Sequence, residues 1–385
     1  MALVDYIPTM APDLRFRLLV SPNASFELSH LENVEQVEVS AAANGPATMW
    51  GLPIIADLKG VDLFHATFNI MPAGLGMPCI TTIHDLMWLE RPEWCATGWR
   101  RYLRQPFFAH GIKRALNQSA IIATVSEATK NAVVLGRPDA SPRTFVTLSG
   151  VSDEFKPSAC ERSKLSAFGL NPERRFVLTV GQFAPYKNHL RVIRSFAQVC
   201  ATRKDVDLVL VQRQGSGSGA LRRFAERLGV GDHIFILPAV SRAELIMLYS
   251  SAELLLHPSL CEGFGNPLAE AMACGCPVVT SDRSAMVEVT AGAATLIDPN
   301  DAGAIARAVC AIIDDQALRS TMRESGLLRA RQLRWSEFAR ANLALYRRAL
   351  RGEPSRVNNS ATIALSTRIK RIFNQIRAPF RRMIS

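Results

Sequence analysis

The chain has 385 residues, of which 48% are hydrophobic and 21% are charged, and its formal net charge is +11. This length allows two domains with full cores, and since the sequence shows neither an apolar run of roughly 18 residues nor a secretory signal pattern, we expect a cytosolic protein without a bilayer-spanning segment. Eight scattered cysteines without a C-x-x-C pair argue against a zinc site or a disulfide framework.

The N-terminal half is predicted to contain strands separated by helices. A basic helix is expected over 100–116, and buried strands are expected at 16–21, 61–67, 79–85 and 120–126. Alternation of this kind indicates a parallel sheet covered by helices on both faces. His84 and Asp85 stand at the end of the third strand, where ligands of α/β folds gather. A lone histidine there is otherwise structural, so both interpretations stay open.

The C-terminal half repeats the alternation more regularly. Strands are expected at 175–180, 206–212, 233–240, 252–259, 277–282 and 293–299. This pattern predicts a Rossmann-like domain. A change in composition around 151–171, rich in proline, serine and glycine, marks a link between the halves. We therefore expect domains over 1–165 and 166–334 that face one another across a cleft.

A lysine follows the first strand of this second half, at the start of a helix. The strand ends at Gly181, and the next loop carries Lys187. A cation beside a helix N-terminus is mildly unfavourable by itself, so a bound anion would account for it. A surface lysine without a ligand is the alternative. Arg213, which follows the next strand, is a second candidate cation.

Residues 252–281 are the most informative segment, because a strand runs through a glycine loop into a helix. Glu262, Gly263 and Gly265 lie in the loop, Asn266 is the predicted N-cap, and Glu270 lies one turn inside the helix. A helix N-terminus attracts phosphate, and glycines let the backbone approach a ligand closely. Either glutamate alone would be ordinary at a helix start, but the pair predicts a ligand with both phosphate and hydroxyl groups, as sugar nucleotides have.

The excess of positive charge is concentrated at the end of the chain. Residues 354–385 contain seven basic residues and no acidic one, which leaves 38 basic against 34 acidic residues in the rest. Apolar residues at helical spacing predict a basic amphipathic helix over 366–385 that lies on an anionic membrane. A disordered basic tail is the alternative. No recognition module for nucleic acid accompanies the charge.

The run from Glu262 through GFGNPLA to Glu270, followed by AMACGCPVVTSD, resembles the E-x7-E signature of retaining glycosyltransferases of family 4 (group 1), which includes many bacterial mannosyltransferases. The resemblance implies that Glu270 holds the ribose of the donor nucleotide and that Glu262 contacts the donor sugar. It assigns Lys187 to the diphosphate, His84 to a sugar hydroxyl, and Asp85 to the loop or the acceptor side. Further expected donor-binding residues are Gly181, Arg213, Gly263, Phe264, Gly265 and Asn266.

The same resemblance implies the GT-B fold, with two Rossmann-like domains that face across a cleft. A last long helix over 335–352 is expected to cross back onto the N-terminal domain, followed by the tail 353–385. The chain opens in what resembles the latter part of the family's first helix, so the N-terminal domain lacks its usual first strand and glycine-rich loop. Either the start codon is placed too far downstream, which we favour because a missing central strand leaves backbone groups unpaired, or the protein is naturally trimmed.

The function implied is transfer of a hexose from a nucleoside-diphosphate sugar, with GDP-mannose favoured, to a glycan or lipid-linked acceptor in cell-surface polysaccharide or lipopolysaccharide synthesis. The enzyme would be cytoplasmic or peripheral on the inner membrane. No D-x-D motif accompanies the site, so we expect neither a metal nor another cofactor. The alternative is a nucleotide-sugar-binding protein without turnover, because the N-terminal glycine-rich loop is missing. A sugar-nucleotide epimerase is disfavoured, because that family lacks the two-glutamate arrangement.

Overall fold

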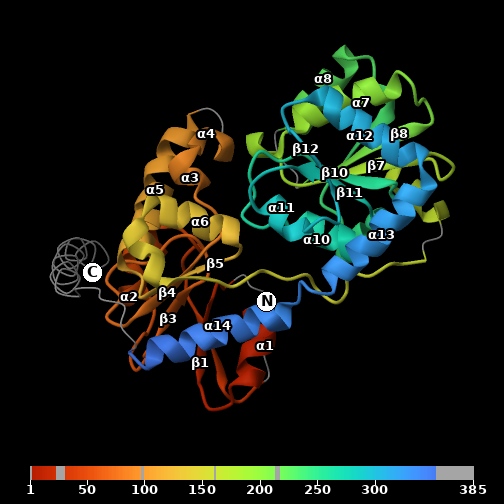
Figure 1. Ribbon diagram of the computed structural model, residues 1–385. Helices are drawn as coiled ribbons and strands as arrows, with labels where there is room; N and C mark the ends of the chain where they lie inside the picture. The colour runs from red at the N-terminus through yellow and green to blue at the C-terminus, as the bar shows by residue number, and fades with distance from the viewer. Residues whose placement is uncertain (1, 23–30, 97–98, 160–161, 213–216, 353–385) are drawn as a thin grey trace, which may run out of the picture.

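The computed structural model describes residues 2–22, 31–96, 99–159, 162–212 and 217–352, and every structural statement below concerns these residues. They form two α/β domains (Figure 1). Arg213 and the predicted amphipathic tail lie outside the described residues.

The N-terminal domain contains short parallel strands and helices of very different length. Its elements are α1 (Ala2–Met10), β1 (Phe16–Val20), β2 (Val34–Glu38), α2 (Pro46–Ile55), β3 (Phe64–Ala66), β4 (Cys79–Ile83), α3 (Met87–Glu90), α4 (Pro92–Cys95), α5 (Arg100–Gln118), β5 (Ile121–Thr124), α6 (Glu127–Gly136), the 3-10 helix η1 (Pro138–Arg143) and β6 (Thr144–Val146). The predicted strands and the basic helix are all present. β2 and β6 were not predicted, since β2 is polar and largely exposed and β6 has three residues.

The sheet of this domain is in two pieces. β1 pairs with β2, and a separate parallel sheet has the order β3-β4-β5-β6. No strand among the described residues lies between β1 and β3, and every residue of both strands lines one cavity of about 2080 Å³. Consecutive residues of a strand point to opposite faces, so a cavity that reaches all of them lies along the strand edge. The facing edges of β1 and β3 are therefore not joined by a backbone ladder.

The C-terminal domain is a complete doubly wound sheet. Its elements are η2 (Arg162–Phe168), β7 (Arg175–Val180), η3 (Pro185–Lys187), α7 (His189–Cys200), β8 (Val206–Val211), α8 (Ser218–Arg227), η4 (Gly231–His233), β9 (Ile234–Leu237), α9 (Arg242–Ser251), β10 (Leu254–His257), α10 (Asn266–Ala273), β11 (Val278–Ser281), α11 (Ala285–Thr290), β12 (Thr295–Ile297), α12 (Ala302–Asp314) and α13 (Gln316–Ala330).

All six strands of this domain are parallel, in the order β12-β11-β10-β7-β8-β9. Adjacent residues enter different cores: Val177 packs in the cluster on one face of the sheet and Leu178 in the cluster on the other. Because both faces of the sheet are buried, the sequence of β8 is a nearly continuous apolar run. The strand order reverses between β7 and β10, and ligands of such sheets bind outside the carboxyl ends of the strands at that point.

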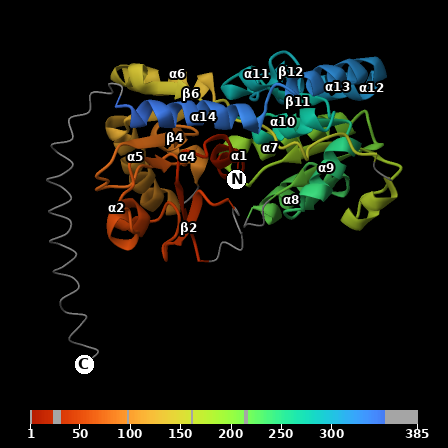
Figure 2. The ribbon, with the colours of Figure 1, turned by 90° about the horizontal axis from the view of Figure 1, so that it is seen from below.

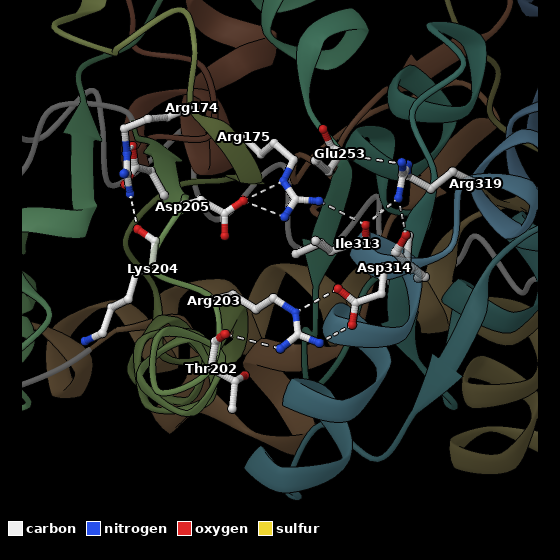
Figure 3. Close-up of polar contacts among 12 residues, drawn as sticks. Arg174, Arg175, Thr202, Arg203, Lys204, Asp205, Glu253, Ile313, Asp314 and Arg319 are labelled. Atoms are coloured by element: carbon white, nitrogen blue, oxygen red, sulfur yellow. Dashed lines mark hydrogen bonds and ion pairs between the residues drawn. The ribbon is translucent and has the colours of Figure 1, made fainter.

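The opposite, amino-terminal edge of this sheet is tied by arginines (Figure 3). Arg175 pairs with Asp205, Arg203 with Asp314, and Arg319 with Glu253. Arg175 and Arg319 also donate to the carbonyl of Ile313 at the end of α12, where a helix has unpaired acceptors. This network lies at the end of the strands away from the β7–β10 loops, so we interpret it as structural.

The last helix, α14 (Trp335–Leu350), links the domains (Figures 1 and 2). Its Ala339 and Leu343 pack against Ile7 and Ala11 of the α1 region. Tyr346 lies 2.6 Å from Nδ1 of His65 on β3, where burial lowers the pKa of His65 to about 4. The helix expected to return to the N-terminal domain therefore lies against α1. None of the described helices combines the length and apolarity that crossing a bilayer requires.

Candidate functional site

The loop after β10 enters helix α10 through a left-handed glycine. Gly265 has a φ of +92° and is the N-cap, so Asn266 is the first helical residue. The prediction that Asn266 caps the helix is wrong, because the chain turns into the helix with a backbone conformation that favours a residue without Cβ. Asn266 is instead exposed on the cavity. On the core face of α10, Leu268, Ala271 and Met272 are fully buried.

Glu262 is the centre of a buried polar cluster. Its Oε1 accepts hydrogen bonds from Nζ of Lys187 at 2.6 Å, from Oγ of Ser259 at 2.7 Å and from Nε2 of His257 at 2.9 Å. Within the described part of the chain these three bonds all go to Oε1, so Oε2 keeps its capacity to accept from a ligand hydroxyl. The loops that follow β7 and β10 therefore meet at the reversal of strand order and bring Lys187 and Glu262 together.

The backbone of Glu262 is held as firmly as its side chain. Ser284 donates from Oγ to the Glu262 carbonyl at 2.7 Å and accepts from the Glu262 N–H at 3.3 Å. Ser284 has a φ of +56°, a conformation that costs free energy for a residue with a Cβ. Leu260 N–H also donates to the Tyr186 carbonyl at 2.7 Å, which joins this loop to η3.

The electrostatics keep Glu262 ionised. Burial would raise its pKa, but the Lys187 ammonium and the bonds from His257 and Lys187 hold the pKa at about 2. Burial and the Lys187 charge lower the pKa of His257, so its imidazole is neutral and donates from Nε2. The cluster is an ion pair between Glu262 and Lys187, and the neutral donors His257 and Ser259 orient the carboxylate.

Glu270 faces the cavity from the first turns of α10. Its Oε2 accepts a 3.1 Å hydrogen bond from the hydroxyl of Tyr249, a fully buried residue of α9. Burial raises the pKa of Glu270, while the Tyr249 bond and the charges of Arg242 and Lys187 oppose that rise. Arg242, which lines the same cavity, forms an ion pair with Glu154 of the linker. Glu270 and Asn266 therefore line the cavity, whereas Glu262 and Lys187 do not.

His84 lies at the cavity from the opposite domain. Its N–H donates to Oδ1 of the buried Asn69 at 2.6 Å, and its Nε2 lies 3.0 Å from the Thr67 carbonyl. A neutral ring must donate from Nε2 to that carbonyl, which leaves Nδ1 as an acceptor. The ring also packs near Phe68, with centroids 5.2 Å apart.

Asp85 organises the turn after His84. Its Oδ1 accepts from the Met87 N–H at 3.0 Å, at the start of α3. Burial raises the pKa of Asp85, and the negative charge of Glu262 adds to that rise. Carboxyl groups from the two domains are thus close enough to affect each other. Of the two roles expected for Asp85, this hydrogen bond supports that of orienting the loop.

The two domains touch directly at the glycine loop. A Cβ placed on Gly263 would lie 1.7 Å from the carbonyl oxygen of His84, so no side chain fits there. The space that glycine leaves here is filled by the backbone of the other domain. The expected contact of Gly263 with the donor stays a prediction. Ser126 caps α6 by accepting from the Thr129 N–H at 3.1 Å, and it also donates to the Gly263 carbonyl at 2.6 Å.

A second contact joins α11 to the start of α6. The carboxylate of Glu288 accepts from the N–H groups of Glu127 at 3.0 Å and Ala128 at 3.1 Å. These are first-turn donors that have no partner within their own helix. A helix of one domain is therefore capped by an acid of the other.

The remaining predicted residues are distributed around this centre. Gly181 lies under the stem of Lys187, since a Cβ there would be 3.2 Å from Cδ and Cε of the lysine. Phe264 is buried in the core. Beyond His84, Trp88 stacks on Phe108 with ring centroids 4.8 Å apart. Among the described residues, no group of three or more His, Cys, Asp or Glu side chains is arranged to hold a metal ion.

Comparison with known proteins identifies the family. Residues 162–329 match the family described as Glycosyl transferases group 1. The C-terminal domain therefore belongs to the group 1 glycosyltransferases. This glycosyltransferase is 26% identical over 293 residues to the O-antigen chain mannosyltransferase B of Escherichia coli, covering 74% of each chain. It is 30% identical over 254 residues to the D-inositol 3-phosphate glycosyltransferase of Mycolicibacterium smegmatis, covering 64% of this chain and 56% of that one.

Solved structures confirm the GT-B fold of the glycosyltransferase. WaaG, a glycosyltransferase involved in lipopolysaccharide biosynthesis, superposes with a TM-score of 0.69 at 18% identity, covering 90% of this chain and 94% of that one. The family match disfavours the alternative of a binding protein without turnover.

Several residues of the glycosyltransferase site were not predicted. Tyr249, His257, Ser259 and Glu288 are brought in by tertiary contacts. His257 had a detectable signal, since it ends a buried strand beside the reversal of strand order. Tyr249 and Glu288 lie on helices whose sequences show no feature that marks them.

Proposed function

We propose that the chain is a retaining hexosyltransferase that transfers mannose from GDP-mannose to a glycan or lipid-linked acceptor at the cytoplasmic face of a membrane. The observation that carries the proposal is the hydrogen bond between Lys187 and Glu262 in the loop that leads into α10, close enough to Glu270 for the Lys187 charge to act on its carboxyl group. The name of the Escherichia coli relative, a mannosyltransferase of O-antigen chains, supports the sugar and the kind of product.

The donor would span the start of α10. Glu270 would accept from the ribose hydroxyls through Oε1, because Tyr249 occupies Oε2. The diphosphate would lie at the α10 N-terminus, where the N–H groups and the helix dipole favour an anion, with Lys187 as the nearby cation. Lys187 keeps two N–H donors besides the one directed at Glu262, so it can bond to both.

The sugar would lie between the two domains. Oε2 of Glu262 and Nδ1 of His84 are acceptors on opposite sides of the domain boundary, and both suit hydroxyl groups of a hexose. Holding the sugar from both domains fixes its reacting carbon against the acceptor, which is a large part of what an enzyme supplies.

The transfer step needs no nucleophile from the protein. The acceptor oxygen bonds to C1 of the sugar on the face from which the nucleoside diphosphate leaves, so the configuration at C1 is retained. The bond from C1 to the phosphate oxygen breaks, its electron pair stays on that oxygen, and the acceptor proton passes to it. Lys187 and the α10 amides stabilise the charge that develops on the diphosphate, which is why we propose that no metal is needed.

Calorimetric titration with GDP-mannose, UDP-glucose and GDP tests the donor. We expect GDP-mannose to bind most tightly and Glu270→Ala to weaken GDP binding about ten-fold or more, through the loss of hydrogen bonds to a charged group. Glu324→Ala, an exposed acid on α13, is the matched control. Tighter binding of UDP-glucose would show that GDP-mannose is not the preferred donor. A product whose anomeric configuration is inverted, as seen by NMR, would reject retention.

A further inference from the structure

A second cation acts on Glu270 besides Lys187. Arg242 is the first residue of α9, and it lines the same cavity as Glu270 on α10. α9 and α10 pack beside each other (Figure 2) on one face of the sheet, whereas α7, which follows Lys187, packs on the other face. The two cations whose charge acts on Glu270 therefore come from different faces of the sheet.

Arg242 is paired with an acid from the linker between the domains. It forms an ion pair with Glu154, and the adjacent Phe155 packs edge-on against Tyr249, with ring centroids 6.4 Å apart. The linker thus runs along α9. Arg242 and Tyr249 lie on the same side of α9, about two turns apart. Because Tyr249 donates to Glu270, this side of the helix leads from the Glu270 carboxylate to the ion pair.

The ion pair is open to a ligand. The side chains of Arg242 and Glu154 are 53% and 61% exposed, and both residues line the cavity. Their hydrogen bond joins Nη1 of the arginine to Oε1 of the glutamate. Within the described part of the chain, other guanidinium N–H groups and Oε2 keep their capacity to bond to a ligand. An exposed ion pair contributes little to stability, so both side chains can change partners at little cost.

The ion pair presents donors directly beside acceptors. Guanine carries the complementary order on its edge: the acceptor O6, followed by the N1–H and the N2 amino group as donors. An arginine can donate to O6, and a carboxylate can accept from N1–H and N2 together. Uracil has an oxygen on each side of its single N–H, so a carboxylate facing that edge would meet an acceptor. The pair therefore suits guanine better than uracil.

We propose that Arg242 and Glu154 recognise the guanine of the donor nucleotide. A nucleotide runs from phosphate through ribose to base. With the diphosphate near Lys187 and the ribose at Glu270, the base extends along α9 toward Arg242. Phe155, which also lines the cavity, supplies an apolar surface beside the base. This inference rests on the proposed donor site, because Lys187 and Glu270 set the direction of the nucleotide.

Calorimetric titration of the full chain with GDP, inosine diphosphate and UDP tests the proposal. Inosine diphosphate keeps O6 and N1–H but lacks the N2 amino group. We expect the wild type to bind GDP about ten-fold more tightly than inosine diphosphate, because a hydrogen bond to a charged group is lost. In Glu154→Ala the two should bind about equally. Arg242→Met should weaken both about ten-fold, since both carry O6, and should change UDP binding less than about two-fold.

A second exposed ion pair provides the matched control. Arg340 and Glu337 pair on α14, with side chains 63% and 59% exposed. Arg340→Met and Glu337→Ala should leave the three affinities, and the ratio between GDP and inosine diphosphate, unchanged. Urea unfolding should give all four variants nearly the midpoint of the wild type, because neither pair is buried.

Glu270→Ala distinguishes this inference from the proposed donor site. It should weaken all three nucleotides alike, because they share the ribose and the diphosphate. If it does so while the wild type binds GDP and inosine diphosphate equally, the donor site stands and guanine recognition is overturned. Arg242→Met that weakens UDP as much as GDP would also overturn it, since Arg242 would then bind a part common to both. A wild type that binds none of the three would reject the donor site and this inference together.

Discussion

The hydroxyl of Tyr249 donates a hydrogen bond of 3.1 Å to Oε2 of Glu270. Tyr249 is fully buried on α9, so its position is fixed by core packing and not by a ligand. One carboxylate oxygen is thereby held by the protein fold, which sets the direction of the other. Tyr249 is a positioning residue for the acid that we assign to the ribose.

Tyr249→Phe should weaken GDP binding about ten-fold and change its pH dependence. Burial raises the pKa of Glu270, and the Tyr249 bond opposes that rise. If the ionised carboxylate accepts from the ribose, binding falls as the pH drops through this pKa. Losing the Tyr249 bond raises the pKa further, so the loss should begin at higher pH. Calorimetry at a series of pH values measures the midpoint, with Tyr102→Phe as control. An unchanged midpoint would contradict the positioning role.

Lys187→Met should destabilise the fold at neutral pH by about 3 kcal/mol, because it leaves the buried Glu262 carboxylate without its cation. Adding Glu262→Gln should recover part of this loss. Glu262 has a pKa of about 2 in the folded protein against an ordinary value of 4.5, so its contribution is present above pH 4.5 and is lost as the pH falls toward 2. Urea unfolding at several pH values should therefore show the wild type and Lys187→Met converging in acid. A gap that stays constant with pH would contradict the ion pair.

Gly263→Ala should separate nucleotide binding from transfer. The new methyl group would overlap the His84 carbonyl and displace the N-terminal domain, while Glu270 and Tyr249 lie within the C-terminal domain. We expect GDP affinity to be kept and kcat/KM to fall about a hundred-fold, since small displacements of reacting groups cost rates of this order. Gly136→Ala, where a Cβ meets nothing within 4 Å, is the control. Equal activity in both variants would show that the contact is dispensable.

Glu288→Ala should loosen the contact between α11 and α6. The acid caps two N–H groups of the other domain, and removing such a cap costs about 1 kcal/mol. Small-angle scattering should show a larger radius of gyration for Glu288→Ala than for the wild type. Glu288→Gln keeps one acceptor oxygen, so its radius of gyration should lie between those two values. An identical scattering profile for all three proteins would mean that other contacts hold the domains together.

The fold was predictable where local pattern and burial agree. β7 and β8 are apolar because both faces of their sheet are covered, and Gly275 ends α10 because it takes a φ of +72° after the helix. Lys187 and Glu262 could be placed together since both follow strands at one edge of the sheet.

Features that depend on distant partners were not predictable. Nothing in the sequence near Gly263 indicates that the carbonyl of His84 occupies the space of its side chain. The same holds for Tyr249, whose function depends on an acid on another helix. β2 escaped prediction because its exposed, charged residues resemble a loop.

The break between β1 and β3 determines how the molecule loses structure. Within the described residues, β1 and β2 share no backbone ladder with the four-stranded sheet, and they are retained by packing on α1, α2 and α14 and by bonds such as Arg17 to the Asp57 carbonyl. Side-chain packing can open locally while a continuous sheet stays closed. The amide hydrogens of β1 should then exchange with solvent through local opening, and faster than those of β4. Because α14 packs on the α1 region, the strength of that packing sets how often β1 and β2 open.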